Sequence, residues 1–304
     1  MHEINFMKMK QATTIEQQIE ILKNRGMLID ISENKTKEIL SDIGYFRLGF
    51  YCFPFETSYP DKKHRTYQYK TGTQFSDIVN LYYLDTDLRR LLSNALNRIE
   101  INFRTNIIYT GSNRYVNSNT WFIDPFVMEK EFIDKFDTEL YTEKFKKKPI
   151  IKHHHKKYIN DKYAPAWKTL EFFTFGTIVN IYKNLKDKLL KQEIAAGYGI
   201  RNEKILNNYF STLVEVRNIC AHNSVLFDHK LYRELKNGPA HNVSSNNGYN
   251  IFSAIKVIWF ILNSISQNRA SELKDEIISL FDKYKKHKLM NWIIENCIGY
   301  KNIF

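Results

Sequence analysis

An arginine, an asparagine and a histidine interrupt an otherwise apolar stretch, VEVRNICAHNSVLFD, over residues 214–228. On a helical wheel, Arg217, Asn218 and His222 share an arc of about 140°, and Ala221 lies within it. The apolar side chains of the stretch fall on the opposite side, and Asn218 and His222 are i,i+4 neighbours. The pattern predicts an amphipathic helix that packs one face into a core and presents the three polar side chains on the other.

These side-chain types suit the cleavage of RNA, whose own 2′-hydroxyl supplies the nucleophile. A histidine can act as general base or general acid near neutral pH. Arg217 would donate to phosphate oxygens as charge builds on them, and Asn218 would orient the imidazole or the sugar hydroxyl. The reaction leaves 2′,3′-cyclic phosphate ends, needs no metal and spares DNA. An Arg-x4-His pair alone is a weak signal, because such a pair also occurs as a helix cap or a structural pair.

The composition points to a polyanionic partner. Lys and Arg total 45 against 33 acidic residues, which gives a net charge of +12 and a pI near 9.3. RNA or DNA is the first expectation and an anionic membrane surface the second. The alternative is a protein that is simply basic. With 43% hydrophobic residues the chain can build a real core, which excludes a disordered tail,.

A basic tract, KFKKKPIIKHHHKKY, covers residues 144–158 and contains seven lysines and no acid. It predicts either a phosphate-binding surface or a solvated, mobile loop. The three adjacent histidines, His153–His155, do not converge on a helix or a strand, so we expect no metal site. The candidate RNA-binding residues are Lys146, Lys147, Lys148, Lys152, Lys156 and Lys157.

Apolar residues recur at helical spacing along most of the chain, and few segments alternate with period two. The pattern predicts an all-α fold, and its longest helix runs from 73 to about 110. Gly26, Ser32 and Gly44 are expected to end or cap the first two helices. The remaining expectations are a buried turn or short helix near 44–55, a loop or hairpin over 56–72, a helix from Pro125 to about 145, two helices over 164–185 hinged near Gly176, a helix over 203–226, a loop over 237–248 and three further helices.

Other signals concern compartment and cofactors. Cys52, Cys220 and Cys297 are few and far apart, which predicts neither disulfides nor a cysteine metal site,. Residues 1–11 lack the apolar block of a signal peptide, and the most apolar run, 257–262, is too short to cross a bilayer. The chain contains no GxxxxGK[ST], GxSxG, HExxH or CxxC motif,. We expect a soluble cytoplasmic protein with no cofactor, no metal and no membrane partner.

The segment VRNICAHNSVLF resembles the signature of the HEPN superfamily of helical RNA-processing domains. Three earlier blocks look like those of the AbiD/AbiF abortive-infection proteins, in matching order, and the resemblance covers roughly residues 15–230. The blocks are LKNRGMLID…ILSDIGYFRLGFYCFPF, TQFSDIVNLYYLDTDLRRLLSNALNRIEINFRT and APAWKTLEFFTFGTIVNIYKNL. The resemblance implies a HEPN-type helical bundle. Residues 1–72 would form an N-terminal extension, 73–236 the HEPN-like domain with a basic insertion near 144–160, and 237–304 C-terminal helices that pack on the bundle.

The resemblance further implies a metal-independent endoribonuclease toxin that acts in anti-phage abortive infection. Arg217 and His222 would be its catalytic pair, with Asn218 as the intervening polar residue. HEPN domains usually pair so that two Arg–His motifs face one cleft, which implies a homodimer. Family members can also associate with structured RNA. Ser224 stands where related toxins controlled by adenylylation carry a tyrosine, so this form of control is not implied.

Several further residues allow two interpretations. Glu100 and Arg104, an i,i+4 pair, form a structural ion pair or brace the active site, and Glu171 pairs with an arginine or orients a catalytic group. The aromatic run Tyr45–Arg47 belongs to the core or stacks on bases. Two alternatives to the enzyme stay open. One is a non-catalytic RNA-binding helical protein whose Arg/His motif binds RNA or stabilises a dimer, and the other is a structural partner protein.

Overall fold

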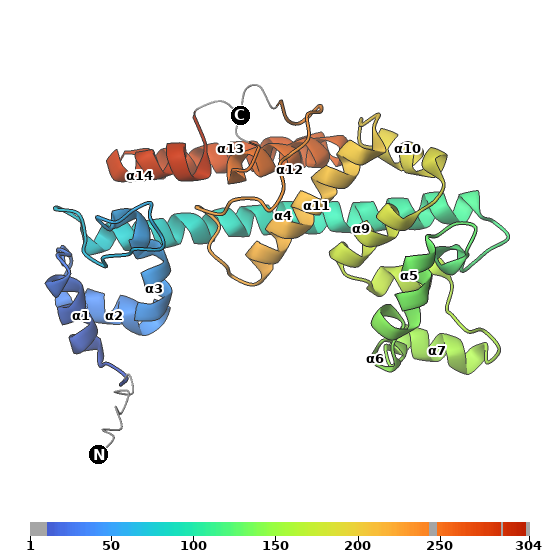
Figure 1. Cartoon of the computed structure of the whole chain (residues 1–304), viewed down its shortest axis with the longest axis horizontal. Coiled ribbons are helices and arrows are strands. Elements are labelled where there is room, and N and C mark those ends of the chain that lie inside the picture. Colours follow the sequence, from blue (N-terminus) through green and yellow to red (C-terminus); the bar gives the residue numbers. More distant parts are fainter. Residues whose placement is uncertain (1–10, 243–247, 287, 302–304) are drawn as a thin grey trace, which may run out of the picture. The chain divides into compact units, whose positions relative to one another are not determined.

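The computed structural model describes residues 11–242, 248–286 and 288–301. This part of the chain is all-α, as the sequence predicts: it holds fourteen α-helices, short 3₁₀ and π turns, and isolated β-bridges in place of strands (Figure 1). Residues 1–86 and 284–293 form one compact unit, and residues 87–283 and 294–304 form a second. The division falls inside α4 (Phe75–Arg114), between Thr86 and Asp87, whereas the sequence suggests a boundary at residue 72.

Local capping defines the first helices of the first unit, α1 (Ile15–Asn24) and α2 (Glu33–Ile43). Thr14 forms a capping box with Gln17 at the start of α1, and the Ser32 hydroxyl accepts from a backbone N–H of α2,. Gly26 and Gly44 end the two helices with φ values of 90° and 87°, a conformation that favours glycine. The stops and caps expected at Gly26, Ser32 and Gly44 are therefore confirmed.

The aromatic segment that follows forms α3 (Tyr45–Cys52) and a 3₁₀ turn, Phe53–Phe55, in which Phe55 is fully buried. Residues 56–72 form a small hairpin. The Thr57 N–H donates to the Gln68 carbonyl at 2.8 Å, and the Lys70 N–H donates to the Phe55 carbonyl at 2.8 Å. Both expectations for this region, a short helix and a hairpin, are confirmed. In the same unit α14 (Lys288–Ile293) brings the Trp292 ring 5.8 Å from the Tyr59 ring.

The core of the second unit is an aromatic cluster around Phe103 of α4, which is fully buried. Its ring stacks on Phe210 at 3.9 Å and lies edge-on to Phe175 and Tyr182 at 6.5 and 5.8 Å. Offset and edge-to-face pairs of this kind add to the burial of apolar area. The cluster holds α9 (Phe175–Asn184) and α11 (Glu203–Ala221) against α4, and α10 (Lys188–Ala196) and α12 (Ile251–Ile265) pack on α11 (Figure 1).

The helix predicted from Pro125 to about 145 is wrong in its boundaries and its continuity. It begins at Lys130 as α5 (Lys130–Lys135), widens into a π turn at Phe136–Leu140, and α6 (Glu143–Lys146) starts anew with Thr142 as its cap. Packing explains the break, because the buried Phe136 ring contacts those of Phe122, Phe132, Tyr141, Tyr163 and Phe173. The remaining elements here are a 3₁₀ turn Trp121–Ile123, α7 (Pro149–Lys157), α8 (Ala166–Thr169) and a 3₁₀ turn Leu170–Phe172.

The break expected near Gly176 lies just before it, where Thr174 caps α9. At the C-terminal side the three predicted helices are present as α12, α13 (Gln267–Lys285) and α14, followed by a π turn, Ile294–Ile298. The apolar run 257–262 lies within α12. None of the described helices combines the length and the apolarity that crossing a bilayer requires. Residues 1–10, which lack the apolar block of a signal peptide, lie outside the described residues, and so do residues 243–247 of the predicted loop.

The packing of Gly111 yields a stability test. A Cβ atom at Gly111 of α4 would lie 2.5 Å from the Trp121 ring, which is fully buried. Gly111→Ala should therefore lower the free energy of unfolding by about 1–3 kcal/mol, because the ring has no room to move away. Gly49→Ala is the matched control, since nothing lies within 4 Å of its Cβ position on α3. We expect it to stabilise by roughly 0.5–1 kcal/mol. Urea unfolding of both variants measures the difference, and equal stabilities would contradict this packing.

Candidate functional site

The helix that carries the motif, α11, ends within it. His222 is the C-cap residue, and its N–H donates to the Asn218 carbonyl at 3.0 Å. Asn223 adopts a left-handed conformation with φ 53°, and the Ser224 N–H donates back to the Ile219 carbonyl at 3.0 Å. Asparagine is one of the few residues that tolerate this conformation, so it terminates the helix. The helix predicted over 203–226 is therefore too long at its end, and His222 stands at a helix terminus.

The polar and apolar faces of the motif are as predicted. Val216, Ile219 and Cys220 are buried, whereas the Arg217 side chain is one-third exposed and His222 is exposed. Arg217 and His222 are five residues apart, a rise of about 7.5 Å along a helix axis. Within the described residues the imidazole of His222 has no hydrogen-bonding partner. It is thus accessible to a ligand, and so is part of the guanidinium.

Asn218 contacts Arg217. The Arg217 Nη1 donates to the Asn218 Oδ1 at 3.3 Å, a long hydrogen bond between exposed groups. The sequence suggested that Asn218 orients the imidazole or a sugar hydroxyl, but in this structure its carbonyl oxygen faces the guanidinium. The asparagine therefore helps to hold Arg217, and its amide nitrogen stays available to a ligand.

A shared carboxylate fixes Arg217 from the other side. The Glu100 Oε2 lies 3.2 Å from Nη2 of Arg217, and its Oε1 accepts from Nη2 of Arg104 at 2.8 Å. Glu100 and Arg104 are only 12% and 10% exposed. Arg104 also donates to the Phe173 carbonyl at 3.1 Å. Buried charges need such partners, because desolvating an unpaired ion costs several kcal/mol. The structure thus brings Glu100 and Arg104 of α4 to the motif on α11.

Glu171 stands at the margin of this network. Its Oε1 lies 3.9 Å from Nη1 of Arg104, and its side chain is 55% exposed. A solvated pair at this distance contributes little to stability. Of the three residues proposed to support the motif, Glu100 contacts Arg217 directly, Arg104 acts through Glu100, and Glu171 makes only a peripheral contact.

Arg89 and Asn223 belong to the same region and were not anticipated. Arg89 of α4 is 4% exposed, and its Nη1 donates to the Asn223 Oδ1 at 3.1 Å. Arg89 lies eleven residues before Glu100, about three helical turns, so both side chains are on one face of α4. That spacing, with arginines among leucines, was the signal available in the sequence. The contact anchors the left-handed turn that follows His222.

A second buried acid ties down the chain after the motif. The Glu215 Oε1 accepts from the Tyr232 N–H at 2.9 Å and lies 2.7 Å from Nε2 of His229. Glu215 is 8% exposed, and Leu226 and Phe227 between the motif and His229 are buried. The sequence did not indicate this contact. Together with Arg89 it holds both ends of the turn, so His222 is presented from a rigid support.

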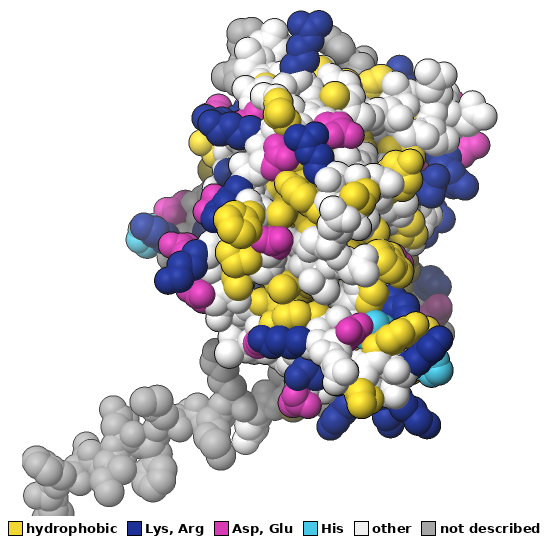
Figure 2. Space-filling view, turned by 90° about the vertical axis from the view of Figure 1, so that its right-hand side faces the viewer, with side chains coloured by type: hydrophobic (Ala, Val, Ile, Leu, Met, Phe, Trp, Pro, Cys, Tyr) yellow, Lys and Arg dark blue, Asp and Glu magenta, His cyan; other side chains and the backbone are white. Residues whose placement is uncertain are grey.

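The basic tract is helical, with α6 and α7 in place of the loop considered as one alternative. Lys147, Lys152, Lys156 and Lys157 are exposed, and Lys146 pairs with Glu143 at 2.8 Å. The Lys148 ammonium lies 5.3 Å from the centre of the Phe172 ring. In Figure 2 dark blue basic side chains and the cyan histidines gather at the lower end of this face.

The three histidines of the tract have separate surroundings. His153 is exposed. His154 is buried, which lowers its pKa below the ordinary value, and its Nε2 lies 3.1 Å from the Asp161 Oδ2. The Nε2 of His155 lies 2.8 Å from the Tyr141 hydroxyl. The rings therefore do not share a ligand position. In the other aromatic candidate, Tyr45–Arg47, the Phe46 side chain is 79% exposed and lies outside the core.

The described residues thus place an exposed histidine at the end of the helix that carries an ion-paired arginine, and a guanidinium is a side chain that can bind a phosphate group,. Residues 38–228, more than half of the chain, match the family described as Abi-like protein. The chain belongs to the Abi-like protein family, a family of abortive-infection proteins. The matched range includes Glu100, Arg104, Arg217 and His222. No curated protein and no solved structure gave a significant match.

The two arginines that share Glu100 should differ in how strongly they couple to it. Removing the buried Arg104–Glu100 contact leaves a desolvated charge, and we expect a coupling free energy of about 1.5–3 kcal/mol. The half-solvated Arg217–Glu100 contact should couple by only about 0.5–1 kcal/mol. Double-mutant cycles that combine Glu100→Gln with Arg104→Gln or with Arg217→Gln measure both values by urea unfolding. Glu171→Gln serves as the control and should change stability by less than about 0.5 kcal/mol. A larger coupling for Arg217 than for Arg104 would contradict the assignment.

Proposed function

We propose that this abortive-infection protein is a metal-independent endoribonuclease toxin whose catalytic residues are Arg217 and His222. The observation that carries the proposal is their joint presentation. Glu100 and Asn218 hold the guanidinium from two sides, and the exposed imidazole stands at the end of the same helix. The family assignment supports the setting, because arresting an infected cell requires a damaging activity.

The chemistry needs two proton transfers. One imidazole accepts the proton of the 2′-hydroxyl as that oxygen attacks the neighbouring phosphorus. The bond from phosphorus to the 5′-oxygen then breaks, a second acid protonates the leaving oxygen, and a 2′,3′-cyclic phosphate remains. General acid–base catalysis of this kind contributes about 10²–10⁴-fold. Since one imidazole cannot conveniently serve as both base and acid, a second copy of the chain would supply the other His222.

Arg217 retains the capacity to bind a phosphate. A guanidinium carries five N–H donors, and the structure engages one of them with Asn218 and one nitrogen with Glu100. The remaining donors can reach the nonbridging oxygens as negative charge develops on them. Glu100 and Asn218 would act as positioning residues that fix the direction of the fork before the substrate arrives.

The lysines of α6 and α7 would bind the RNA backbone. Lys147, Lys152, Lys156 and Lys157 are exposed and carry no carboxylate partner among the described residues, so their charges are available to phosphates. Such contacts release counterions and make affinity depend on salt. This observation also favours the second candidate function, a non-catalytic RNA-binding protein.

Cleavage of RNA in the presence of EDTA tests the proposal. Wild-type protein should produce 2′,3′-cyclic phosphate ends, and DNA should stay intact. His222→Ala and Arg217→Ala should each reduce the rate by about 10²–10⁴-fold, because each removes a group that acts on the reacting atoms. His64→Ala is the matched control, since that side chain is 82% exposed and lies outside the motif. His222→Ala and Arg217→Ala should also abolish the growth arrest that expression causes. The control His64→Ala should preserve it.

Three results would count against this proposal of a metal-independent ribonuclease with His222 as a catalytic residue. They are RNA that binds but stays intact with the wild type, cleavage that persists in a folded His222→Ala variant, and cleavage that stops in EDTA. The first of these favours the RNA-binding alternative. The homodimer is tested separately: light scattering of the wild type should give twice the mass of one chain, 36.3 kDa.

The lysine surface yields a salt-dependence test. A variant with Lys147, Lys152, Lys156 and Lys157 replaced by Gln should bind single-stranded RNA more weakly at low salt. The slope of log affinity against log salt should flatten by about 0.7 for each phosphate that the variant no longer binds. Because the four side chains are exposed, the midpoint of thermal unfolding should be the same in the variant as in the wild type.

A matched charge variant serves as the control for this test. It removes four exposed lysines from other parts of the same unit, Lys130, Lys188, Lys204 and Lys301. If both variants flatten the slope equally, net charge alone determines binding and the surface on α6 and α7 has no special role.

A further inference from the structure

The first unit contains a cavity of about 240 Å³, open to solvent, between α1, α2, α3 and the hairpin 56–72. One water molecule needs only about 10–15 Å³ of such volume, so the cavity has room for a small organic molecule. Its walls are mainly aromatic. The aromatic side chains that line it are those of Tyr45, Phe46, Phe50, Tyr67, Tyr69 and Phe75.

Three of these rings are exposed to an extent unusual for large apolar groups. Phe46 is 79% exposed, Tyr67 48% and Phe50 44%. The Phe46 and Phe50 rings lie edge-to-face with their centres 5.1 Å apart. Aromatic groups that stay exposed around a concave surface are typical of a binding site, because aromatic groups that only filled the core would be buried.

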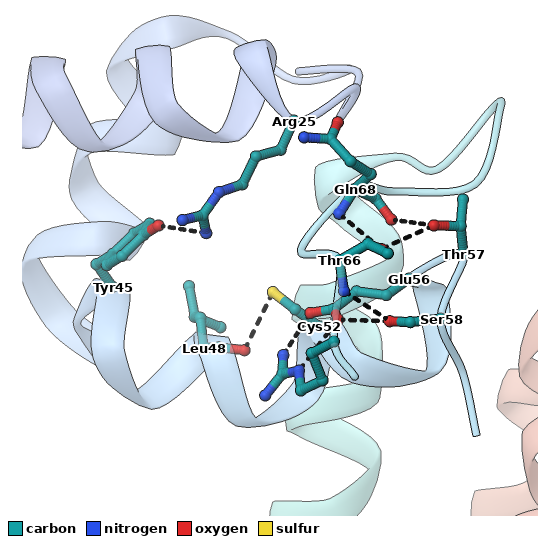
Figure 3. A network of polar contacts seen from close by, with 10 residues as sticks. Arg25, Tyr45, Leu48, Cys52, Glu56, Thr57, Ser58, Thr66 and Gln68 are labelled. Carbon is teal, nitrogen blue, oxygen red and sulfur yellow. Dashed lines mark hydrogen bonds and ion pairs between the residues drawn. The ribbon is translucent and has the colours of Figure 1, made fainter. Parts of the chain in front are cut away.

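Two guanidinium groups flank the ring of Tyr67. The guanidinium carbon of Arg25 lies 5.3 Å from the ring centre, and that of Arg65 lies 4.8 Å from it. Arg25 also donates to the Tyr45 hydroxyl at 3.1 Å, as the close view in Figure 3 shows. Both arginines line the cavity.

The two arginines differ in their charge balance. Arg65 binds both oxygens of the buried Glu56 carboxylate, which is 1% exposed, and so is neutralised. Among the described residues Arg25 pairs with no carboxylate. The cavity therefore keeps one uncompensated guanidinium, which a ligand anion would complement.

Two other buried groups of the lining, the Cys52 thiol and the Tyr69 hydroxyl, are uncharged. Burial raises the pKa of the Cys52 thiol to about 11, and its Sγ donates to the Leu48 carbonyl at 3.5 Å. Burial likewise raises the pKa of the Tyr69 hydroxyl above its ordinary value. Both groups stay protonated near neutral pH, so this part of the cavity suits an uncharged, planar ring.

The backbone at Tyr67 adopts a rare conformation. Its φ of 56° lies in the left-handed region, which is strained for a bulky residue,. Glycine or asparagine would sit there with little strain. The strain is concentrated at the residue whose ring contacts two guanidiniums. Such residues cluster at ligand sites, where the side chain must be held in one place.

We propose that this cavity binds a nucleotide. The heteroaromatic ring of the ligand would stack on Phe46, beside the Tyr67 ring that contacts both guanidiniums, and its phosphate would pair with Arg25. Two sources share this chemistry, an unpaired nucleotide within an RNA chain and a free mononucleotide. The site is separate from the Arg217–His222 pair, and the proposal does not depend on cleavage there.

Fluorescence of 2-aminopurine, which stacking quenches, tests the site. The full-length His222→Ala protein, which cannot cut RNA by the proposed route, is titrated with 2-aminopurine ribonucleoside monophosphate. It is then titrated with a short RNA that carries one unpaired 2-aminopurine. Saturable quenching by either probe is expected. Quenching by both identifies a site open to free nucleotides, and quenching in the RNA alone identifies the RNA chain as the source.

Variants then assign the quenching to the cavity. Phe46→Ala and Arg25→Gln should each weaken binding about tenfold to a hundredfold, the range expected when one stacking or ionic interaction is removed. Phe126→Ala and Arg201→Gln are the matched controls. Phe126 is 93% exposed, Arg201 is exposed, and neither lines the cavity. The controls should bind as the parent protein does.

Tyr67→Asn separates a binding role from a structural one. Asparagine relieves the left-handed strain but removes the ring, so the thermal midpoint should stay equal or rise while affinity falls at least tenfold. A purely structural tyrosine would give the reverse, a lower midpoint with unchanged affinity. That result, or the absence of saturable quenching by both probes at millimolar concentration, overturns the proposal.

Discussion

The candidate site depends on one buried carboxylate. Glu100 lies on α4 within the core of the second unit, where an ionised acid is tolerated only with cationic partners. Arg104, on the next turn of the same helix, satisfies one of its oxygens, and Arg217 on α11 satisfies the other. The position of Arg217 is therefore set by charge balance inside the protein. Because Arg104 also binds the Phe173 carbonyl, the network joins α4, α11 and the segment before α9, and the aromatic cluster around Phe103 holds the same elements together.

Backbone conformation marks both sites that we assign. Among the described residues only Asn223 and Tyr67 combine a side chain with a positive φ. Asn223 follows His222 and adopts this conformation at little cost, so it serves as an ordinary helix terminator held by Arg89,. At Tyr67 the same conformation is sterically unfavourable, because the left-handed region disfavours a bulky side chain. The first case is explained by local geometry alone. The second accompanies the cavity, where the ring contacts the guanidiniums of Arg25 and Arg65.

The sequence predicted those features that neighbouring residues determine. The all-α class, the caps at Ser32 and Gly44 and the i,i+4 pairing of Glu100 with Arg104 follow from contacts within one or two turns,. The end of α11 at Ala221 was missed although Asn223 marks it locally, and the π turn at Phe136–Leu140 was missed because tertiary packing sets it. Contacts between residues far apart in the sequence could not be predicted either: Asn223 is 134 residues from Arg89. The sequence could name Arg217 and His222 as candidates, but not the carboxylate that holds one of them.

The cationic side chains of the second unit differ in how far they are buried, and this difference limits the role that each can take. Arg104 is 10% exposed and is paired with Glu100 and the Phe173 carbonyl, so its charge serves the protein interior. Arg217 is 33% exposed and partly engaged, which leaves it positioned yet able to bind another anion. The lysines of α7 are exposed and long, so they attract polyanions over a Debye length of about 8 Å but fix no geometry,. A ribonuclease needs all three: a charge that stabilises the scaffold, a charge held in place for the reacting phosphate, and mobile charges that retain the chain. A guanidinium fixed by a buried acid, on the helix that ends at an exposed imidazole, is therefore the arrangement on which the proposal of catalysis rests.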